Sequence, residues 1–210
     1  NPKMWRNAED WLRGALKALK VPYREMIGEA AFYGPKIDLQ IKTALGHVVT
    51  VSTIQLDFLL PERFDMTYIN EKGEKQRPVF IHAGIIGTFE RYMAILLEQT
   101  KGVLPLWLSP IQVQFFPVNT EVHGKYAAKL QQKLVKLGFR AKIDDTDNRV
   151  GYKIRNAQTK KVPYQIVIGD EEVKSKDKTI TYRQYGKTEE IKVPFSKFVS
   201  MIKKQIKEHK

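Results

Sequence analysis

The chain has 210 residues, 42% of them hydrophobic, which is enough for one large domain or two ordinary domains, each with a core. It contains no cysteine, and this excludes a disulfide framework, a CxxC redox pair and any thiolate metal site within these residues. No apolar run approaches the roughly 18 residues that a membrane span needs. The first residues, Asn1-Pro2-Lys3, are typical of neither an initiator nor a signal peptide, so we expect a piece of a longer chain.

The net charge of +13 is unevenly distributed. Residues 1–110 carry 14 Lys and Arg against 12 Asp and Glu, whereas residues 111–210 carry 22 against 11. A basic half joined to a nearly neutral half indicates that the second half holds a polyanion. Nucleic acid is the first candidate and an anionic membrane surface the second, while a lysine-rich solubilising surface explains the same charge.

The first half has the pattern of helices packed against an antiparallel sheet. Apolar residues recur at helical spacing over residues 4–20, which predicts an amphipathic helix. Alternation and turn signals predict strands at 37–41, 48–58, 66–69 and 79–81, the last two flanking a hairpin tip at 71–75. A second helix, ending at Gly102, is predicted to turn inward Phe89, Met93, Leu96 and Leu97.

Residues 105–110 break the pattern and predict the joint between two domains, 1–108 and 109–210. The later part alternates strands and helices, which predicts a small α/β domain with a mixed sheet. Its predicted strands are 113–117, 139–143, 164–168 and 179–183. Its predicted helices are 126–137, one around 152–159, and a last one whose inner face holds Phe195, Phe198, Val199, Ile202 and Ile206.

The most informative motif is Gly84-Ile85-Ile86-Gly87-Thr88-Phe89-Glu90-Arg91, a glycine-rich turn that enters a helix. Glycines let a ligand approach the backbone, and a helix start favours anions. An arginine there offers its fork to phosphate and its flat face to an aromatic base. Because glycine-rich turns before helices are common, the motif alone is also compatible with an ordinary surface pair at a helix end.

Several further segments occur in register with this motif. They are residues 31–38 (AFYGPKID), 53–58 (TIQLDF), 81–82 (IH), 107–110 (WLSP), 151–155 (GYKIR) and 169–173 (GDEEV). Together they resemble the C-terminal portion of the threonyl-tRNA synthetases, in which residues 84–91 would be motif 3 of a class II synthetase. The resemblance covers essentially the whole chain. It implies the end of a class II catalytic core followed by an anticodon-binding domain, and a ligase that acts in the cytoplasm.

The resemblance implies roles for residues of the first domain. Arg91 would stack on the adenine of ATP and reach its γ-phosphate, and with Gln55 it would form the catalytic set. The residues lining the ATP site, which would bind ATP with Mg²⁺, would be Lys36, Gln55, Thr88 and Arg91. Tyr33 would contact the threonine substrate.

His82 would be one of three protein ligands of a zinc ion that grips the amino group and hydroxyl of threonine. A metal that demands an oxygen ligand rejects valine, whereas an apolar pocket separates a hydroxyl from an isosteric methyl by roughly a hundredfold at best. Imidazole is a good zinc ligand. From the residues alone, a satisfied histidine at a strand end is the commoner role for such a position.

The sequence departs from the family pattern in two ways. Ala83 stands where arginine is common, which removes a cation near the nucleotide. The segments that carry motifs 1 and 2 and the other two zinc ligands lie upstream of this chain in the family. We therefore expect that the chain alone neither activates threonine nor binds zinc tightly, since zinc needs three or four ligands. The family's homodimer relies on motif 1.

In the second domain the resemblance implies anticodon contacts from Asp147, Arg149, Arg155, Glu172 and Arg183. Unstacked bases are read on their hydrogen-bonding edges by charged and amide side chains, while lysines hold the backbone. Solvated surface charge is the alternative for each of these residues. Two other classes stay open for the chain, a non-catalytic synthetase-derived RNA-binding module and, less favoured, a basic membrane-surface module.

Overall fold

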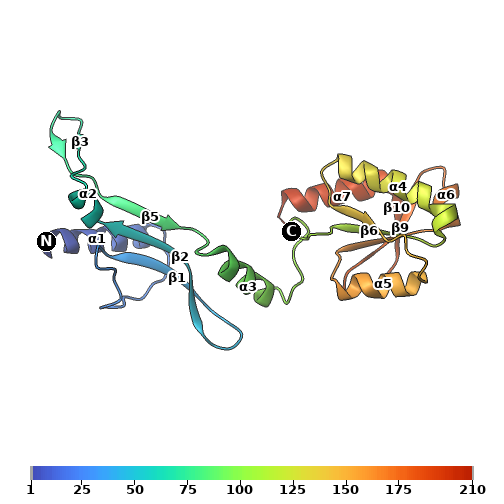
Figure 1. Ribbon diagram of the computed structural model, residues 1–210, viewed down its shortest axis with the longest axis horizontal. Helices are drawn as coiled ribbons and strands as arrows, with labels where there is room; N and C mark the ends of the chain where they lie inside the picture. The colour runs from blue at the N-terminus through green and yellow to red at the C-terminus, as the bar shows by residue number, and fades with distance from the viewer. Residues whose placement is uncertain (1, 210) are drawn as a thin grey trace. The chain divides into compact units, whose positions relative to one another are not determined.

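A computed structural model describes residues 2–209 of the chain (Figure 1). The chain divides into two compact units, one up to Lys101 and the other from Gly102 onward. The structure therefore has the two-part organisation that the change in sequence pattern predicts. The finer boundary between functional domains after Leu108 stays a prediction. Within the described residues, no helix is long and apolar enough to cross a membrane.

Unit 1 is a three-stranded antiparallel sheet with helices. Its elements are α1 (Pro2–Ala18), β1 (Lys36–Lys42), β2 (Val48–Asp57), α2 (Leu59–Arg63), β3 (Tyr68–Ile69), β4 (Lys75–Gln76), β5 (Phe80–Gly84) and α3 (Phe89–Gln99). The sheet order is β1-β2-β5, so the long β2 pairs with a strand on either side. The predicted antiparallel sheet is confirmed, and β2 is its centre.

Two details of unit 1 differ from the prediction. The hairpin strand opposite β3 is the short polar β4, not residues 79–81; of these, Phe80 and Ile81 instead belong to β5 and pair with β2. The side chains of Phe89, Met93 and Leu97 on α3 are exposed rather than turned inward, and α3 has no buried residue among those described. Helical spacing predicts an apolar stripe correctly, but it cannot predict whether the same unit covers that stripe.

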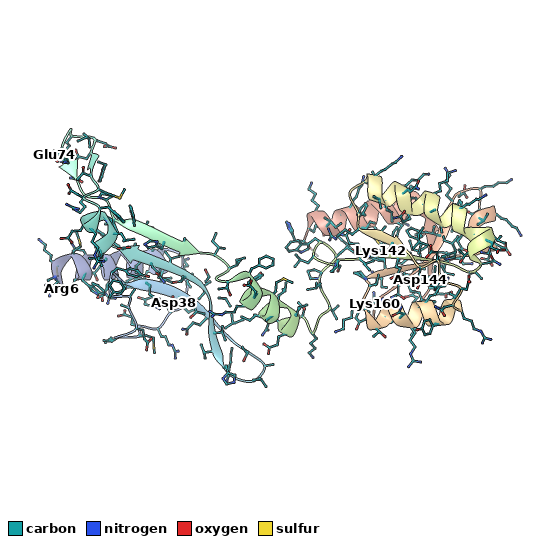
Figure 2. The ribbon with its side chains drawn as sticks, in the orientation of Figure 1. Arg6, Asp38, Glu74, Lys142, Asp144 and Lys160 are labelled. Atoms are coloured by element: carbon teal, nitrogen blue, oxygen red, sulfur yellow. The ribbon has the colours of Figure 1, made fainter. Side chains whose placement is uncertain are left out.

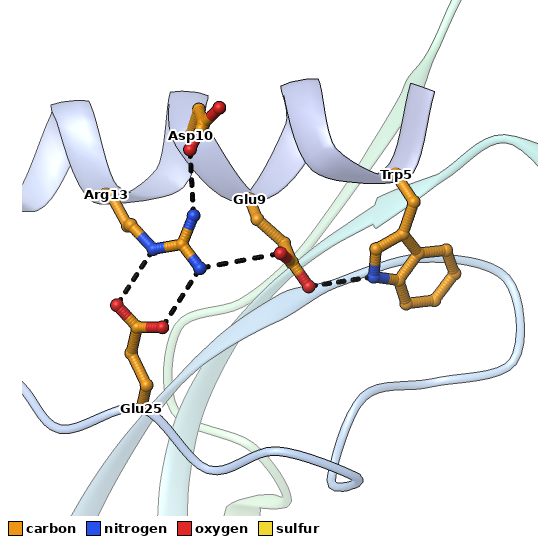
Figure 3. A network of polar contacts seen from close by, with 5 residues as sticks. All are labelled: Trp5, Glu9, Asp10, Arg13 and Glu25. Atoms are coloured by element: carbon orange, nitrogen blue, oxygen red, sulfur yellow. Dashed lines mark hydrogen bonds and ion pairs between the residues drawn. The ribbon is translucent and has the colours of Figure 1, made fainter. Parts of the chain in front are cut away.

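A polar network holds the segment that follows α1 (Figure 3). Arg13 donates two hydrogen bonds to the carboxylate of Glu25, at 2.8 and 2.9 Å, and a further one to Asp10. Glu9 accepts from both Arg13 and the indole N–H of Trp5. The hydrogen bonds from Arg13 hold the pKa of Glu25 below its ordinary value. The fork thereby fixes the course of the chain from α1 toward β1.

Unit 2 is a five-stranded mixed sheet between helices. Its elements are β6 (Val113–Pro117), α4 (Thr120–Lys136), β7 (Ala141–Ile143), α5 (Val150–Thr159), β8 (Tyr164–Ile168), α6 (Asp170–Lys174), β9 (Thr179–Gln184), β10 (Ile191–Pro194) and α7 (Phe195–Lys207). The order is β10-β9-β8-β6-β7, with β7, β6 and β8 parallel and the rest antiparallel. The predicted mixed sheet is confirmed.

The core of unit 2 lies mainly on one face of this sheet. Figure 1 shows α4 and α7 over that face and α5 over the other. Leu130 and Leu134 of α4 and Phe198 and Ile202 of α7 are fully buried in one cluster with residues of β6, β8 and β9. A smaller cluster under α5 contains Phe116, Ala157 and Val162. Loops follow the carboxyl ends of the parallel strands β6, β7 and β8. These loops contain the second candidate site.

Among the described residues, the sequence prediction misses four short elements, α2, β4, α6 and β10. It also begins α4 too late, because Asn119 caps the helix by accepting hydrogen bonds from the backbone N–H groups of Glu121 and Val122. An asparagine at this position is an N-terminal signal that apolar spacing alone does not detect.

Candidate active-site face and nucleic-acid interface

In unit 1, the register of the sheet brings three predicted site residues into one row. Lys36 on β1 lies opposite Gln55 on β2, and Gln55 lies opposite His82 on β5. Directly opposite residues of antiparallel strands point to the same face of the sheet. The next row on that face holds Asp38, Thr53 and Gly84. We call the side chains of these two rows, together with Tyr33, the polar face.

The polar face is joined by a chain of hydrogen bonds. Tyr33 donates its hydroxyl proton to Oε1 of Gln55, whose Nε2 donates to Oγ1 of Thr53 at 3.1 Å. Thr53 donates to Asp38 at 2.7 Å, and Nζ of Lys36 forms an ion pair with the same carboxylate at 2.6 Å. Each member fixes the next, so the row is preorganised for polar ligands.

Asp38, which Figure 2 labels in unit 1, and Thr53 are members of this network that the sequence reasoning did not single out. A signal for them exists in the sequence. Each lies two residues from a predicted site residue on the same strand, and a period of two places both on one face. Asp38 orients the Lys36 ammonium, and Thr53 links that pair to Gln55.

His82 is held by a buried carboxylate. Its Nε2 lies 2.9 Å from Oδ2 of Asp57, whose side chain is only 1% exposed, whereas the His82 side chain is 43% exposed. Oδ1 of Asp57 accepts from the backbone N–H groups of Leu59 and Leu60 at the start of α2. A carboxylate behind an imidazole sets its orientation, as in histidines that bind metals through the other ring nitrogen.

The described residues contain no group of three or more His, Cys, Asp or Glu side chains that could hold a metal ion. His82 is an oriented imidazole with an exposed edge, so it fits the role of a single ligand. Zinc bound there needs further ligands from outside the described residues.

The glycine-rich turn lies against β2. Gly87 has φ of +60°, and a Cβ there would come within 3.1 Å of the carbonyl oxygen of Val51. Thr88 then caps α3, accepting from the backbone N–H of Arg91 at 3.4 Å. The Arg91 guanidinium donates to the carbonyl of Thr50, also at 3.4 Å, and is otherwise exposed. The structure thus places Thr88 and Arg91 beside β2, the strand that also carries Gln55.

Asp57 makes the stability of unit 1 depend on pH. Burial raises the pKa of this carboxyl. Hydrogen bonds from the backbone N–H groups of Leu60 and Leu59 and from His82 lower the pKa by more than burial raises it, so that it lies below its ordinary value. A lowered pKa stabilises the folded state above about pH 4, and this contribution is lost as pH falls through the folded-state pKa.

We therefore expect Asp57→Asn to lower the free energy of unfolding of unit 1 by about 1–3 kcal/mol at pH 7. The difference from wild type should shrink as the pH falls from about 4 toward 3, because the carboxyl then takes up a proton in the unfolded wild-type chain before it does so in the folded one. Urea unfolding of both proteins at a series of pH values measures this. A difference that stays constant from pH 7 to pH 3 would contradict the ionised state of Asp57.

In unit 2, the candidate RNA contacts lie around the carboxyl ends of the parallel strands and on the α5 side of the sheet. Asp147 and Arg149 are exposed in the loop of residues 144–149, between β7 and α5, and Arg155 is exposed on α5. This edge is where α/β sheets commonly bind ligands, because the helices there diverge to opposite faces. The structure thus brings Asp147 and Arg149 together in one loop.

Arg183 lies on β9, opposite Gln165 of β8, with its side chain 32% exposed. Its guanidinium forms an ion pair with Glu190 in the loop before β10. Lys192 on β10 pairs in the same way with Glu171 of α6, at 2.6 Å. Arg183 is therefore a positioned, partly open cation rather than a freely solvated one.

Glu172 is the least accessible of the predicted contacts, at 8% exposure. Its Oε2 accepts from the backbone N–H of Gly169 at 2.9 Å, and its Oε1 accepts from the hydroxyl of Thr181 at 2.6 Å. These bonds join the turn after β8 to β9. A carboxylate has about four lone-pair sites, so Glu172 retains acceptor capacity beyond this structural role.

Comparisons with known proteins agree with this division. The family of the tRNA synthetase class II core domain (G, H, P, S and T) matches residues 2–100, and the anticodon binding domain family matches residues 112–205. A solved structure titled the RNA binding domain of threonyl-tRNA synthetase from Cryptosporidium parvum Iowa II superposes with a TM-score of 0.87 at 33% identity. The match covers 98% of this chain and 51% of the chain in that solved structure. The fold is therefore that of a class II aminoacyl-tRNA synthetase segment with its anticodon-binding domain.

The sequence relatives define the family more narrowly. The threonine–tRNA ligase of Ureaplasma parvum serovar 3 is 56% identical over 99% of this chain, and that of Lactobacillus acidophilus is 50% identical over 100%. The chain belongs to the threonine–tRNA ligase family. It spans about a third of the length of these curated relatives, 36% and 32% respectively.

Proposed function

We propose that this chain is part of an enzyme that ligates threonine to its tRNA. The reaction proceeds in two steps, through a threonyl-adenylate, and uses ATP with Mg²⁺. Unit 1 supplies one wall of the active site and unit 2 reads the anticodon. The observation that carries the proposal is the row of Lys36, Gln55 and His82 on one face of the sheet, with Arg91 beside the same central strand.

The polar face supports a specific division of labour. Lys36 and Arg91 offer cationic donors to the phosphates of ATP, and Arg91 also offers a flat face to adenine. Gln55, fixed by its bonds to Tyr33 and Thr53, presents an amide to the reacting carboxylate and phosphate. Tyr33 lies at the end of this network, with its ring 5.9 Å from that of His82, and contacts the threonine substrate.

His82 would hold the zinc ion of the complete enzyme, with Asp57 orienting its ring. When bound, the metal would supply a Lewis acid for the amino group and hydroxyl of threonine, which valine, lacking the hydroxyl, could not satisfy. The complete protein would act in the cytoplasm as a homodimer. Ala83, in the position between His82 and the glycine-rich turn, leaves this stretch without the cation that the family often has there.

The chain alone is expected to show no threonine-dependent ATP–pyrophosphate exchange. The described residues provide one candidate zinc ligand and one wall of the site, and zinc needs three or four ligands. The assay is run on the 210-residue chain and on the complete protein in parallel, with and without added zinc. Exchange by the chain alone would contradict this division of the active site.

The same pair of assays separates the competing function. A non-catalytic RNA-binding module derived from a synthetase predicts tRNA binding without exchange even by the complete protein. Ala83 favours this alternative, whereas the connected row from Tyr33 to Lys36 favours the enzyme.

Arg183→Ala is expected to weaken binding of the threonine-accepting tRNA by about 1–3 kcal/mol and to reduce anticodon discrimination. The reason is that Arg183 is already fixed by Glu190 and loses little freedom when it contacts a base edge. Glu190→Gln is the matched variant, since it removes the ion pair and keeps the arginine, and it should weaken binding less than Arg183→Ala does. A loss in Arg183→Ala that is equal for all tRNAs would make Arg183 a phosphate contact instead.

A further inference from the structure

A lysine side chain lies buried at the edge where the proposed anticodon contacts are found. Lys153 of α5 is 1% exposed, and its Nζ donates to the backbone carbonyl of Asp144 at 3.1 Å and to that of Pro117 at 3.4 Å. Among the described residues, no ion pair joins it to a carboxylate within 4.0 Å. A buried ammonium without a paired carboxylate is electrostatically costly, and a neutral side chain of the same length would fill the space at lower cost.

The contacts of Lys153 close the loop of residues 144–149 at both ends. Its backbone N–H donates to the carbonyl of Arg149, at the last residue of the loop, at 3.2 Å. Its Nζ binds the carbonyl of Asp144, at the first residue, and the carbonyl of Pro117 at the end of β6. One residue thereby sets the distance between the two ends of the loop that presents Asp147 and Arg149.

The interior of the loop is built outward from Asp144, which Figure 2 labels in unit 2. The backbone N–H of Asp144 donates to the carbonyl of Phe115 on β6 at 2.9 Å. Its carboxylate accepts from the hydroxyl of Thr146 at 2.6 Å, and Nδ2 of Asn148 donates to that hydroxyl oxygen at 3.1 Å. These hydrogen bonds therefore connect Asp144, which is fixed to β6, with Thr146 and Asn148, the residues on either side of Asp147.

We propose that Lys153 is a positioning residue for base reading: its buried ammonium, by binding the carbonyls of Asp144 and Pro117, holds the loop of residues 144–149 in the conformation that presents Asp147 and Arg149 to the anticodon. The inference rests on the proposed anticodon-reading function. Lys153 touches no base or phosphate itself, because it lies beneath the loop and is closed off from solvent. Its effect is on selectivity between RNAs and not on the general attraction of a basic surface for RNA.

The test compares Lys153→Met with wild type in the 210-residue chain. The probes are an RNA stem-loop with the anticodon of a threonine-accepting tRNA and the same stem-loop with its middle anticodon base changed. The measured quantity is the ratio of the two dissociation constants, at two salt concentrations and a temperature at which both proteins are folded. We expect the ratio to fall about tenfold, the lower range for loss of a well-placed base contact, with an unchanged salt dependence.

Lys129→Met is the matched control, since it removes one exposed lysine from α4 on the opposite side of the sheet. It should leave the ratio unchanged. A Lys153→Met protein that is folded and keeps the wild-type ratio would overturn the inference and leave Lys153 as a packing residue. A wild-type chain that does not discriminate between the stem-loops would overturn the proposed reading function, and the inference with it.

Thr146→Val decides the matter if Lys153→Met does not fold. This exposed substitution removes the two hydrogen bonds of the Thr146 hydroxyl, to Asp144 and from Asn148, and leaves the buried side chains and the 3.3 Å bond from the backbone N–H of Thr146 to Asp144 in place. A lowered ratio supports control of selectivity by the anchored loop. A wild-type ratio would show that the conformation of the loop does not set selectivity, which overturns the role proposed for Lys153.

Discussion

Gly34→Ala is expected to lower the free energy of unfolding of unit 1 by about 3 kcal/mol or more. A Cβ on Gly34 would lie 1.9 Å from the carbonyl oxygen of Leu56 on β2. The backbone cannot retreat easily, because it is hydrogen-bonded on both sides of this glycine, to Leu56 of β2 and to Phe58 directly after β2. The carbonyl of Tyr33 accepts from the N–H of Phe58, and that of Pro35 accepts from the N–H of Leu56, at 3.1 and 3.0 Å.

The same substitution should displace the polar face. Tyr33, next to Gly34, donates to Gln55, and Lys36 begins the strand that pairs with Gln55. Amide hydrogen exchange in β2, measured along a urea series, gives the stability of unit 1 separately from unit 2. Gly14→Ala is the control, because nothing lies within 4 Å of a Cβ at that helical position, and it should stabilise by up to about 1 kcal/mol. Equal protection of the β2 amides from hydrogen exchange in Gly34→Ala and wild type would contradict the close approach of Gly34 to the carbonyl oxygen of Leu56.

Phe198→Ala is expected to lower the free energy of unfolding of unit 2 by about 3–5 kcal/mol. The ring is fully buried and packs against Tyr164 and Tyr182, with ring centroids 5.3 and 5.1 Å away. Its removal leaves a cavity in the cluster that joins α7 to the sheet, in addition to the lost transfer of apolar surface. Domains of this size are stable by only about 5–15 kcal/mol, so this is a large fraction of the total.

Urea unfolding followed through the amides of β6 and β8 measures this loss. Lys197→Ala, an exposed change on the same helix, should stay within about 0.5 kcal/mol of wild type. A loss below about 1 kcal/mol in Phe198→Ala would mean that α7 is not an integral part of the core of unit 2.

Much of this fold could be predicted because burial leaves a periodic trace in the sequence. The alternation over residues 48–58 correctly predicts β2, and the face of β2 that holds Thr53, Gln55 and Asp57 carries the candidate site. The apolar spacing of α7 likewise identifies Phe195, Phe198 and Ile202, which are buried. In these elements a single side of the chain packs against the rest of its own unit, so the pattern and the structure coincide.

The failures occur where that condition is absent. The strand β4 is two polar residues, Lys75 and Gln76, held by backbone hydrogen bonds that leave no apolar pattern. Helix α6 is five residues long, too short for a period to show. The contact of Asp57 with His82 could not be predicted from the sequence either. A role for an aspartate at the end of β2 becomes clear only once β5 is known to pair with β2.

The site residues themselves were identified through family resemblance, and the structure adds how they are held. Sequence motifs give no distances, so the row of Lys36, Gln55 and His82 and the chain of bonds from Tyr33 to Asp38 could not be read from them. The burial of Lys153 could not be predicted either, since a lysine in a basic half of a chain is ordinarily interpreted as a solvated surface charge.

The central claim is that unit 2 reads an anticodon rather than attracting any polyanion. The direct test is the affinity of this chain for a threonine-accepting tRNA and for the same tRNA with its middle anticodon base changed, each at two salt concentrations. Base readout predicts a preference for the unchanged tRNA that survives added salt, while the affinity for both falls. Equal binding of the two tRNAs that collapses with salt would contradict it and reduce the basic half to a polyanion-binding surface.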